Sequence, residues 1–337
     1  MKSSSVGVGV IGTGMIGTVH AGNLARRTIG ARVAAVMDID QERAKAVAAD
    51  LGASVYASAE DLIADPSVDA VLIASPDAAH ADQTIACIEA GKPALCEKPL
   101  ATTAADGERV LRAELAAGRQ LVQVGFMRVY DRAHAEVYEM LRGRELGKVV
   151  NCRSVHINPW TGAKTIDKAL VNSLIHDIHS IRWLMGEEIE RVFTQWVRAE
   201  PEEPRSARFA TVQLQFASGA IGSMEWNGDS GYGYEVMVEV VGERGTARSV
   251  SHSSPVLRRG STIAQEVTPN WPERFGQAYI DEAQIWVDSV RSGEPTGPSA
   301  WDGYMSLVAA EACLRSTETG LPEASVGIER PALYNPR

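Results

Sequence analysis

The sequence lacks the features that define several common protein classes. Its four cysteines, spread over 337 residues, show no C-x-x-C spacing, which argues against a zinc ribbon and against a disulfide framework. No apolar run reaches the roughly 18 residues that a membrane-spanning helix needs. Internal repeats, low-complexity tracts and long linkers are also missing. We therefore expect a globular protein of the reducing cytoplasm with no membrane partner.

Blocks of basic residues are absent as well. The net charge is −10, and no Lys or Arg cluster is present that could bind a phosphate backbone, so we expect no nucleic-acid partner. The N-terminal stretch, residues 1–12, lacks an A-x-A-like cleavage site, and we expect a first strand there rather than a signal peptide. The length of 337 residues predicts two domains.

A glycine motif follows the first predicted strand, residues 6–11. It has the pattern G-x-G-x-x-G and leads directly into a predicted helix. The first glycine permits a tight turn, the second lets the backbone approach a pyrophosphate, and the third allows close packing of helix on strand. The free N–H groups of the helix start then attract the phosphates. The expected cofactor-binding residues of this loop are Gly12, Gly14, Met15, Ile16 and Gly17.

Asp38 ends the second predicted strand, about 20 residues beyond the last glycine, where a carboxylate accepts hydrogen bonds from the adenosine ribose. The same charge would repel a 2′-phosphate. The next residues, Ile39 and Asp40, supply no cation, and Arg43 lies slightly farther on, so NAD is favoured over NADP. The alternative role of Asp38 is a helix N-cap, but Asp40 is better placed to cap the helix of residues 41–51.

Strands and helices alternate through the first third of the chain, which predicts a parallel Rossmann sheet. The loops after its strands should line the cofactor crevice, because ligands bind at the carboxyl ends of such strands. Ser75 and Pro76 follow one strand, and Glu97 and Lys98 follow the next. His80 begins a helix beside the crevice, either as a ligand contact or as a structural histidine.

From about residue 127 the pattern changes to consecutive strands, which predicts a large, open, mainly antiparallel sheet. The expected domains are a dinucleotide-binding domain, 1–126, and an α+β domain for substrate binding and oligomerisation, 127–337. A predicted helix, residues 168–185, backs this sheet. It contains VNSLIHDIH, in which Asn172 and His176 are four residues apart and would share one helix face.

Several motifs together resemble the glucose-fructose oxidoreductase and inositol dehydrogenase family (Gfo/Idh/MocA). They are GTGMIG, the segment from Ser75 to His80, CEKPL at 96–100, VGFMRVYD at 124–131, the cluster ending at His176, and YGYEVMVEVVGERGT at 232–246. The resemblance covers almost the whole chain and is greatest to the inositol 2-dehydrogenase branch. One departure is Val129, where the family usually has a second Arg.

The resemblance implies hydride transfer between a cyclitol or sugar carbon and NAD. It assigns Lys98, His176 and an acid four positions before that histidine to catalysis. Ser75, Pro76, His80, Glu97 and Lys98, which lie beside the predicted crevice, are expected to bind the cofactor. The resemblance also implies a Lys98–Pro99 bond that is often cis, and a homo-oligomer, often a tetramer. The assignments are chemically reasonable, because His titrates near neutrality and a Lys ammonium stabilises a developing alkoxide.

The expected acid is replaced by Asn172, and His179 stands where a second Asp is common. Asn cannot hold a proton or a charge. Three interpretations remain. Asn172 orients a substrate hydroxyl while Lys98 and His176 act; or another group, Asp177, His179 or His156, takes the place of the acid; or the chain is a catalytically weak protein that binds NAD and a sugar.

Further residues of the second domain are candidates for substrate contact, because aromatic rings stack on sugar faces and polar groups bind hydroxyls. The expected substrate-binding residues are Lys98, Met127, His156, Asn172, His176 and Tyr234. Asn158, Trp160, Tyr232 and Tyr279 are further possibilities, although such aromatics more often belong to a core or an interface. The pair His176 and His179 lacks a third and fourth ligand, so we expect no metal.

Overall fold

The structure is a computed structural model that describes residues 5–159, 162, 164–249 and 255–335. Its contacts group the chain into two compact units. Unit 1 consists of Met1–Met127, Gln277–Leu307 and Ile328–Arg337, and unit 2 of Arg128–Gly276 and Val308–Gly327. The predicted division placed all of residues 127–337 in one domain, whereas these contacts return two later segments to unit 1. Strand and helix patterns do not reveal such a return.

Unit 1 is built on a six-stranded sheet in the order β3-β2-β1-β4-β5-β6, with every neighbouring pair parallel. The predicted parallel Rossmann sheet is therefore confirmed. Its strands are β1 (Val6–Ile11), β2 (Ala31–Met37), β3 (Ser54–Tyr56), β4 (Ala70–Ile73), β5 (Ala94–Glu97) and β6 (Val122–Gly125).

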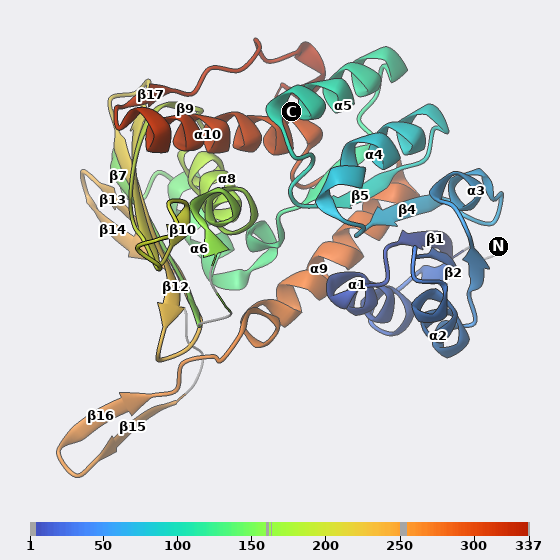
Figure 1. The fold of residues 1–337 in the computed structure, drawn as a ribbon, viewed down its shortest axis with the longest axis horizontal. Coiled ribbons are helices and arrows are strands. Elements are labelled where there is room, and N and C mark those ends of the chain that lie inside the picture. Colours follow the sequence, from blue (N-terminus) through green and yellow to red (C-terminus); the bar gives the residue numbers. More distant parts are fainter. Residues whose placement is uncertain (1–4, 160–161, 163, 250–254, 336–337) are drawn as a thin grey trace. The chain divides into compact units, whose positions relative to one another are not determined.

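The helices of unit 1 flank this sheet (Figure 1). Three of those described, α2, α3 and α5, begin at residues whose side chains accept a free backbone N–H. Asp40 caps α2 by accepting the Arg43 N–H, and Gly52 ends it with a left-handed φ of 69°. The helices are α1 (Met15–Arg26), α2 (Gln41–Leu51), α3 (Ala59–Ala64), α4 (His80–Glu89) and α5 (Ala104–Ala117), with the 3-10 turns η1 (Asp77–Ala79) and η4 (Ala332–Tyr334).

The core of unit 1 includes a segment distant in sequence. Trp286 and Val287 of α9 (Trp271–Ser292) join Val8, Val10 and Leu72 of the sheet in one buried cluster. Burying side chains of this size stabilises the fold by about 1.5–3 kcal/mol each. This packing is the physical reason that residues 277–307, which include the start of α10 (Ala300–Thr319), belong to unit 1.

Unit 2 is built on a seven-stranded sheet in the order β14-β13-β7-β12-β11-β9-β17. The β7–β12 pair is parallel and the other neighbours are antiparallel, as the prediction of a mainly antiparallel sheet required. The strands are β7 (Val149–Pro159), β9 (Ile189–Val197), β11 (Phe209–Phe216), β12 (Ile221–Ser230), β13 (Glu235–Gly242), β14 (Gly245–Arg248) and β17 (Glu323–Ala324). Unit 2 also contains two separate two-stranded sheets, β8 (Lys164–Thr165) with β10 (Ser206–Ala207) and β15 (Val256–Arg259) with β16 (Thr262–Gln265).

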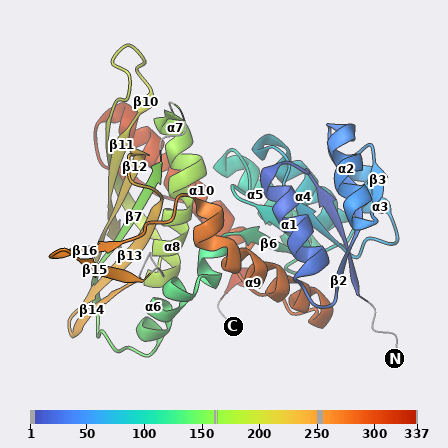
Figure 2. The ribbon, with the colours of Figure 1, turned by 90° about the horizontal axis from the view of Figure 1, so that it is seen from below.

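One face of this sheet is covered by α8 (Ile175–Met185), as Figure 2 shows. Buried positions alternate along β12, and Trp226 of that strand packs with Leu174, Ile178 and Ile181 of the helical segment. The remaining helical elements are α6 (Arg132–Arg142), α7 (Ile166–Lys168), the π turn η3 (Ala169–Leu174) and the 3-10 turn η2 (Met127–Tyr130). Within the described ranges, no helix combines the length and apolar character needed to cross a membrane.

Candidate active site

The glycine loop joins β1 to α1, and its glycines are required by different contacts. Gly12 has a φ of 88°, and a Cβ there would lie 2.4 Å from the Ala74 carbonyl oxygen. A Cβ on Gly17 would lie 2.0 Å from the Gly12 carbonyl oxygen. At Gly14 the nearest atom to an added Cβ would be Nη1 of Arg43, 3.8 Å away, so a ligand can approach the Gly14 backbone closely. An open backbone at a helix start suits a dinucleotide pyrophosphate.

Asp38 directly follows β2 and is buried, with 5% of its surface exposed. Its Oδ2 accepts the Thr13 N–H at 2.7 Å and the Thr13 hydroxyl at 2.9 Å, and its Oδ1 accepts the Asp40 N–H at 2.9 Å. Burial alone would raise the pKa of Asp38, but these hydrogen bonds and Arg43 lower it. The ionised carboxylate has roughly four acceptor positions and keeps capacity for a ribose hydroxyl.

Arg43 lies closer to Asp38 than its place in the sequence indicated. Its Nη1 is 3.9 Å from Asp38 Oδ2, and its Nη2 donates to Asp40 Oδ2 at 3.0 Å. The guanidinium is about half exposed at the mouth of the glycine loop. A cation is therefore present next to the predicted ribose site, held by two carboxylates.

We expect Asp38→Asn to move the cofactor preference from NAD toward NADP. The substitution keeps an acceptor for Thr13, removes the charge that repels a 2′-phosphate, and leaves Arg43, still paired with Asp40, beside the site. The ratio of kcat/KM with NAD to kcat/KM with NADP should fall about 10- to 100-fold, equivalent to about 1.4–2.7 kcal/mol. Steady-state kinetics with both cofactors measure this ratio, and an unchanged ratio would exclude Asp38 as the selecting residue.

Ser75 and Pro76 follow β4 at the same sheet edge as the glycine loop, and Pro76 precedes η1. The Ser75 hydroxyl donates to Gln83 Oε1 at 2.6 Å. His80 is buried, and its two ring nitrogens face main-chain oxygens, those of Pro99 and Ser75. This engagement favours the structural role that the sequence left open for His80.

Glu97 ends β5 and anchors the main chain of Lys98. Its Oε1 lies 2.8 Å from His20 Nε2, and its Oε2 accepts the Lys98 N–H at 3.1 Å. Burial would raise the pKa of Glu97, but His20 and Lys98 outweigh it and lower the pKa. An ionised carboxylate therefore fixes the backbone at Lys98, whose side chain is partly exposed at the carboxyl end of the strand. The Lys98–Pro99 bond is cis, as the resemblance implied.

A second buried carboxyl group, that of Glu282 on α9, lies near Glu97. It is fully buried, and within the described residues neither of its oxygens has a hydrogen-bond partner. Burial and repulsion from Glu97 raise the pKa of Glu282 well above its ordinary value. The two carboxyl groups thus differ in charge: Glu97 is ionised and Glu282 is neutral.

Glu282→Met should stabilise the protein, and more so at higher pH. The unfolded chain releases the Glu282 proton above about pH 4.5 while the folded protein keeps it, so wild-type stability falls as pH rises above that value. Removing an unpaired buried polar group should gain about 1–3 kcal/mol, or roughly 2–4 °C in Tm for each kcal/mol. Thermal unfolding at pH 5 and pH 8 measures the effect.

Glu114→Met is the matched control, because Glu114 is equally buried but fully partnered. Its carboxylate accepts the N–H groups of Leu121 and Val122 at 2.5 and 2.7 Å and the Tyr334 hydroxyl at 2.6 Å. Its loss leaves three buried donors unpaired at about 1–3 kcal/mol each. The Tm should fall here and rise in Glu282→Met, and two changes of the same sign would contradict the assignment.

The helix predicted across residues 168–185 is not regular, because η3 is a π turn. A π turn contains one extra residue, which rotates the preceding positions by about 100° relative to α8. Asn172 lies within this turn and is exposed, whereas His176 lies in α8 and is 7% exposed. Regular helix geometry therefore does not place Asn172 and His176 on one face. The sequence contains no signal that would have predicted this turn.

Asp177, next to His176, is at the centre of a buried network in unit 2. Its Oδ1 accepts from Arg128 Nη1 at 2.7 Å and from the Ser154 hydroxyl, and its Oδ2 accepts from His156 Nδ1 at 2.8 Å. Burial would raise the pKa of Asp177, but Arg128 and His156 lower it far below its usual range. These contacts argue against Asp177 as a replacement for the missing acid.

The contacts of His156 define its tautomer. A carboxylate only accepts, so Nδ1 of His156 must carry the proton that it donates to Asp177, and the nearby Arg128 Nη2 at 3.1 Å is not bonded to that nitrogen. Burial lowers the pKa of His156 despite the charge of Asp177. The ring is neutral at pH 7, and only its Nε2 is left to contact a substrate.

The other predicted contact residues are mostly buried. Met127 is 2% exposed at the start of η2, and His179 is 2% exposed in α8. Tyr234 is 4% exposed, with its ring edge-on to His156 at a centroid distance of 5.8 Å. Tyr232 is exposed and donates to Glu235. Trp160 lies outside the described residues.

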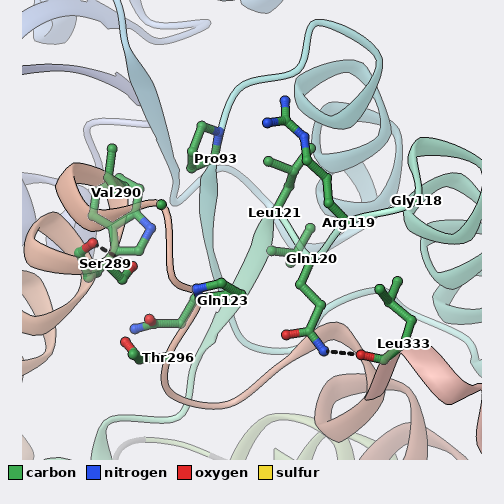
Figure 3. A pocket seen from close by; sticks show the side chains of 14 residues that line it. Pro93, Gly118, Arg119, Gln120, Leu121, Gln123, Ser289, Val290, Thr296 and Leu333 are labelled. Atoms are coloured by element: carbon green, nitrogen blue, oxygen red, sulfur yellow. Dashed lines mark hydrogen bonds between the residues drawn. The ribbon is translucent and has the colours of Figure 1, made fainter. Parts of the chain in front are cut away.

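A cavity of about 300 Å³ lies at the amino-terminal ends of strands of the parallel sheet (Figure 3). Pro93 and Leu121 line it, and these residues precede β5 and β6. Because dinucleotides bind at the carboxyl ends of parallel strands, this cavity at the amino ends is not the cofactor site.

Three residues with direct roles in these arrangements were missed by the sequence analysis. Thr13, a variable position of the glycine motif, holds Asp38; His20, in the helical pattern of α1, pairs with Glu97; and Arg128 neutralises Asp177. Arg128 lies in the motif at 124–131 that carried part of the resemblance, which was the only available signal.

Comparison with known families gives two matches that together span most of the chain. Residues 6–126 match the NAD-binding Rossmann fold of the GFO_IDH_MocA oxidoreductase family. Residues 138–324 match the C-terminal alpha/beta domain of the same family.

Individual relatives match over almost their full length. An inositol 2-dehydrogenase of Rubrobacter xylanophilus is 44% identical over 335 residues, which cover 98% of this chain and 96% of that protein. The crystal structure of myo-inositol dehydrogenase from Lactobacillus casei with NAD(H) and myo-inositol has a TM-score of 0.93 and 34% identity, covering 98% and 99% of the two chains. Scyllo-inositol dehydrogenase from the same organism, with NAD(H) and scyllo-inositol, has a TM-score of 0.89 and 25% identity, covering 95% and 99%.

Proposed function

The chain belongs to the Gfo/Idh/MocA oxidoreductase family, and from this premise we propose that it oxidises a ring hydroxyl of a myo-inositol-like cyclitol. It is an NAD-dependent oxidoreductase. The open glycine loop and the ionised Asp38 fit NAD. When bound, NAD supplies the hydride acceptor, C4 of its nicotinamide ring. The observation that carries the proposal is the place of Lys98, which follows β5 at the same sheet edge as the glycine loop.

In this proposal, Lys98 and His176 both serve the hydroxyl group that is oxidised. Oxidation removes a hydride from carbon and a proton from oxygen, so the oxygen carries negative charge as the reaction proceeds. The Lys98 ammonium stabilises that charge, and His176 accepts the proton. Glu97 supports this role because its carboxylate fixes the Lys98 main chain.

Asn172 has a different proposed role from the acid that the family usually has there. It is exposed in the π turn, and its amide both donates and accepts, which suits the orientation of a substrate hydroxyl. This supports the first of the three interpretations. The second interpretation, in which Asp177, His179 or His156 replaces the acid, is weakened for Asp177 and His156 by the network that these two residues form.

The test is the formation of NADH, followed by absorbance, with myo-inositol, scyllo-inositol, other inositol isomers, glucose and xylose, each also with NADP. We expect turnover with at least one inositol isomer and preference for NAD. Turnover only with a pyranose would replace the proposed substrate. NAD binding without turnover of any compound would favour the catalytically weak alternative.

Asn172→Asp separates the interpretations of this position. If Asn172 orients a hydroxyl, the carboxylate loses the donor that the amide supplies, and kcat/KM with the best substrate should fall about 10-fold, or about 1.4 kcal/mol. The measurement is steady-state kinetics with that substrate. A large gain in inositol oxidation would instead show that the wild-type site is a weakened one.

A homo-oligomer, with a tetramer favoured, and a cytoplasmic location complete the proposal. The strands β11 and β12 alternate buried with more exposed positions, so the sheet has a second face available for another subunit. The four cysteines are free and buried, which suits a reducing compartment. Sedimentation velocity measures the oligomer, and a monomer at micromolar concentration would contradict this part.

A further inference from the structure

His80, the first residue of α4, makes an unusual pair of contacts. The residue is 1% exposed, with Nδ1 at 2.7 Å from the Pro99 carbonyl oxygen and Nε2 at 2.8 Å from the Ser75 carbonyl oxygen. Carbonyl oxygens only accept hydrogen bonds, and a neutral imidazole carries a single N–H. Both contacts are hydrogen bonds only if both ring nitrogens are protonated.

We propose that His80 is a buried imidazolium at neutral pH and a positioning residue for Lys98, because it ties the Pro99 carbonyl to the Ser75 carbonyl. Pro99 directly follows Lys98 after β5, and Ser75 follows the neighbouring strand β4. The ring thus cross-links two loops at the sheet edge of the glycine motif. The inference rests on the function proposed above, in which Lys98 acts on the substrate oxygen.

The Lys98 main chain is held from both sides by charged groups. On one side the Glu97 carboxylate accepts the Lys98 N–H at 3.1 Å and is paired with His20. On the other side His80 donates to the carbonyl of the residue that follows. Charge-assisted hydrogen bonds are stronger than neutral ones, so this arrangement restricts the backbone from which the Lys98 side chain projects.

The surroundings of His80 decide whether the ring can stay charged. Among the residues that the structure describes, the groups that face it are the two carbonyls and the sulfur of Cys96 on β5, and no carboxyl group is among them. Burial lowers the pKa of His80, and the start of α4 also disfavours a cation. Cys96 and the two carbonyls outweigh these effects and raise the pKa to about 10.

Two other buried histidines differ in their partners. His134 and His156 each use Nδ1 toward a carboxylate, Asp131 and Asp177, and burial lowers the pKa of both rings. Burial alone therefore does not produce a charged histidine in this protein. The distinguishing feature of His80 is a carbonyl oxygen at each ring nitrogen.

The direct test is NMR of the full-length protein labelled with ¹⁵N-histidine, at pH 8, with and without NAD. We expect a ring with two protonated nitrogens, and its resonances should disappear in His80→Gln. If none of the seven histidines is doubly protonated at pH 8, the proposal is wrong. The wild-type spectrum needs no turnover, so its outcome is independent of the proposed substrate. It can be recorded even if the variant does not fold.

Kinetics of His80→Gln test the positioning role. Gln has one donor group where the imidazolium has two, so one carbonyl is released, and kcat per NAD-binding site should fall about 10- to 100-fold, as misplacement of a reacting group does. The Kd for NAD should change less than about threefold, equivalent to under about 0.7 kcal/mol. A purely structural role would lower Tm and leave kcat per NAD-binding site within about twofold of wild type, which would refute positioning.

His134→Gln is the matched control for the loss of a buried histidine. It should lower Tm with kcat within about twofold of wild type, because its hydrogen-bond partner is Asp131, which is not one of the proposed active-site residues. An equal loss of kcat in both variants would mean that the effect of His80→Gln is general.

The pH dependence of stability gives a further check. Wild-type stability should fall between pH 6.5 and about 10, where the folded ring keeps its proton and the unfolded one has lost it, and His80→Gln should lose this slope.

Discussion

Lys98→Met is expected to lower kcat for alcohol oxidation about 10²- to 10³-fold, or about 2.7–4 kcal/mol in transition-state stabilisation. Methionine keeps the length and apolar stem of lysine but has no ammonium to stabilise the developing negative charge on the substrate oxygen. The main chain remains held by Glu97, so the fold and the Kd for NAD should change little. Stopped-flow measurement of NADH formation separates the chemical step from product release.

Lys92→Met is the matched control at the opposite end of the same strand. Lys92 precedes β5, and its Nζ donates to the Asp65 carbonyl oxygen at 2.7 Å. Its loss should cost about 0.5–1.5 kcal/mol of stability and leave kcat within about twofold of wild type. Wild-type turnover by Lys98→Met would refute the assigned role, and equal losses in both variants would point to a general effect on unit 1.

Asp177→Ala is expected to destabilise the protein by about 3–5 kcal/mol, because it leaves the Arg128 guanidinium buried without its counter-charge. Arg128 is 1% exposed and Asp177 is fully buried, so water cannot replace the lost partner. The Tm should fall roughly 2–4 °C for each kcal/mol. Calorimetry or circular dichroism measures this loss.

The pH dependence has a definite sign here. The pKa of Asp177 is lowered in the folded protein, so its contribution is present above the ordinary value of 3.8 and is lost as pH falls below it. Asp177→Ala should therefore be destabilised strongly at pH 7 and less at acidic pH. A constant difference across this range would contradict the ionised network.

Asp167→Ala gives a matched comparison within unit 2. Asp167 forms two hydrogen bonds with Arg205, at 2.5 and 2.9 Å, but both side chains are partly exposed. Such a pair contributes only about 0–1 kcal/mol. If the two variants lost equal stability, burial would not be the reason for the importance of the Arg128–Asp177 pair.

The buried network also concerns the proposed site, because Asp177 immediately follows His176 at the start of α8. Arg128, Ser154 and His156 hold Asp177 and so restrain the first turn of this helix. In wild type the network should keep His176 in one position. A lower kcat in the folded fraction of Asp177→Ala would reflect this restraint.

Local patterns predicted unit 1 closely. Residues 6–11 and 41–51 form the strand and the helix expected of them. Here hydrophobic periodicity, the Asp40 cap and glycine ends act within a few residues of each other, so the sequence expresses them directly. The contacts group residues 277–307 with unit 1 because Trp286 and Val287 pack on strands more than 200 residues earlier, and no local pattern encodes that packing.

The irregular helix around Asn172 shows a different limit. The periodicity of residues 168–185 predicts one continuous helix, and the π turn η3 differs from it by a single inserted residue. Its hydrogen bonds depend on the backbone and on the packing of Leu170 and Leu174 in the core of unit 2. A change this small in geometry leaves the residue pattern almost unaltered, yet it alters which side chains share a face.

By itself, the sequence determined the parallel dinucleotide-binding sheet, the place of Asp38 and Lys98 after their strands, and the family. These follow from short-range spacing and from strand order, which place residues at one sheet edge. The tertiary structure alone decided the charges of Glu97 and Glu282, the double contact of His80 and the enclosure of Asp177. The reason is physical: ionisation depends on burial and on partners brought close by folding, and these partners are distant in the chain.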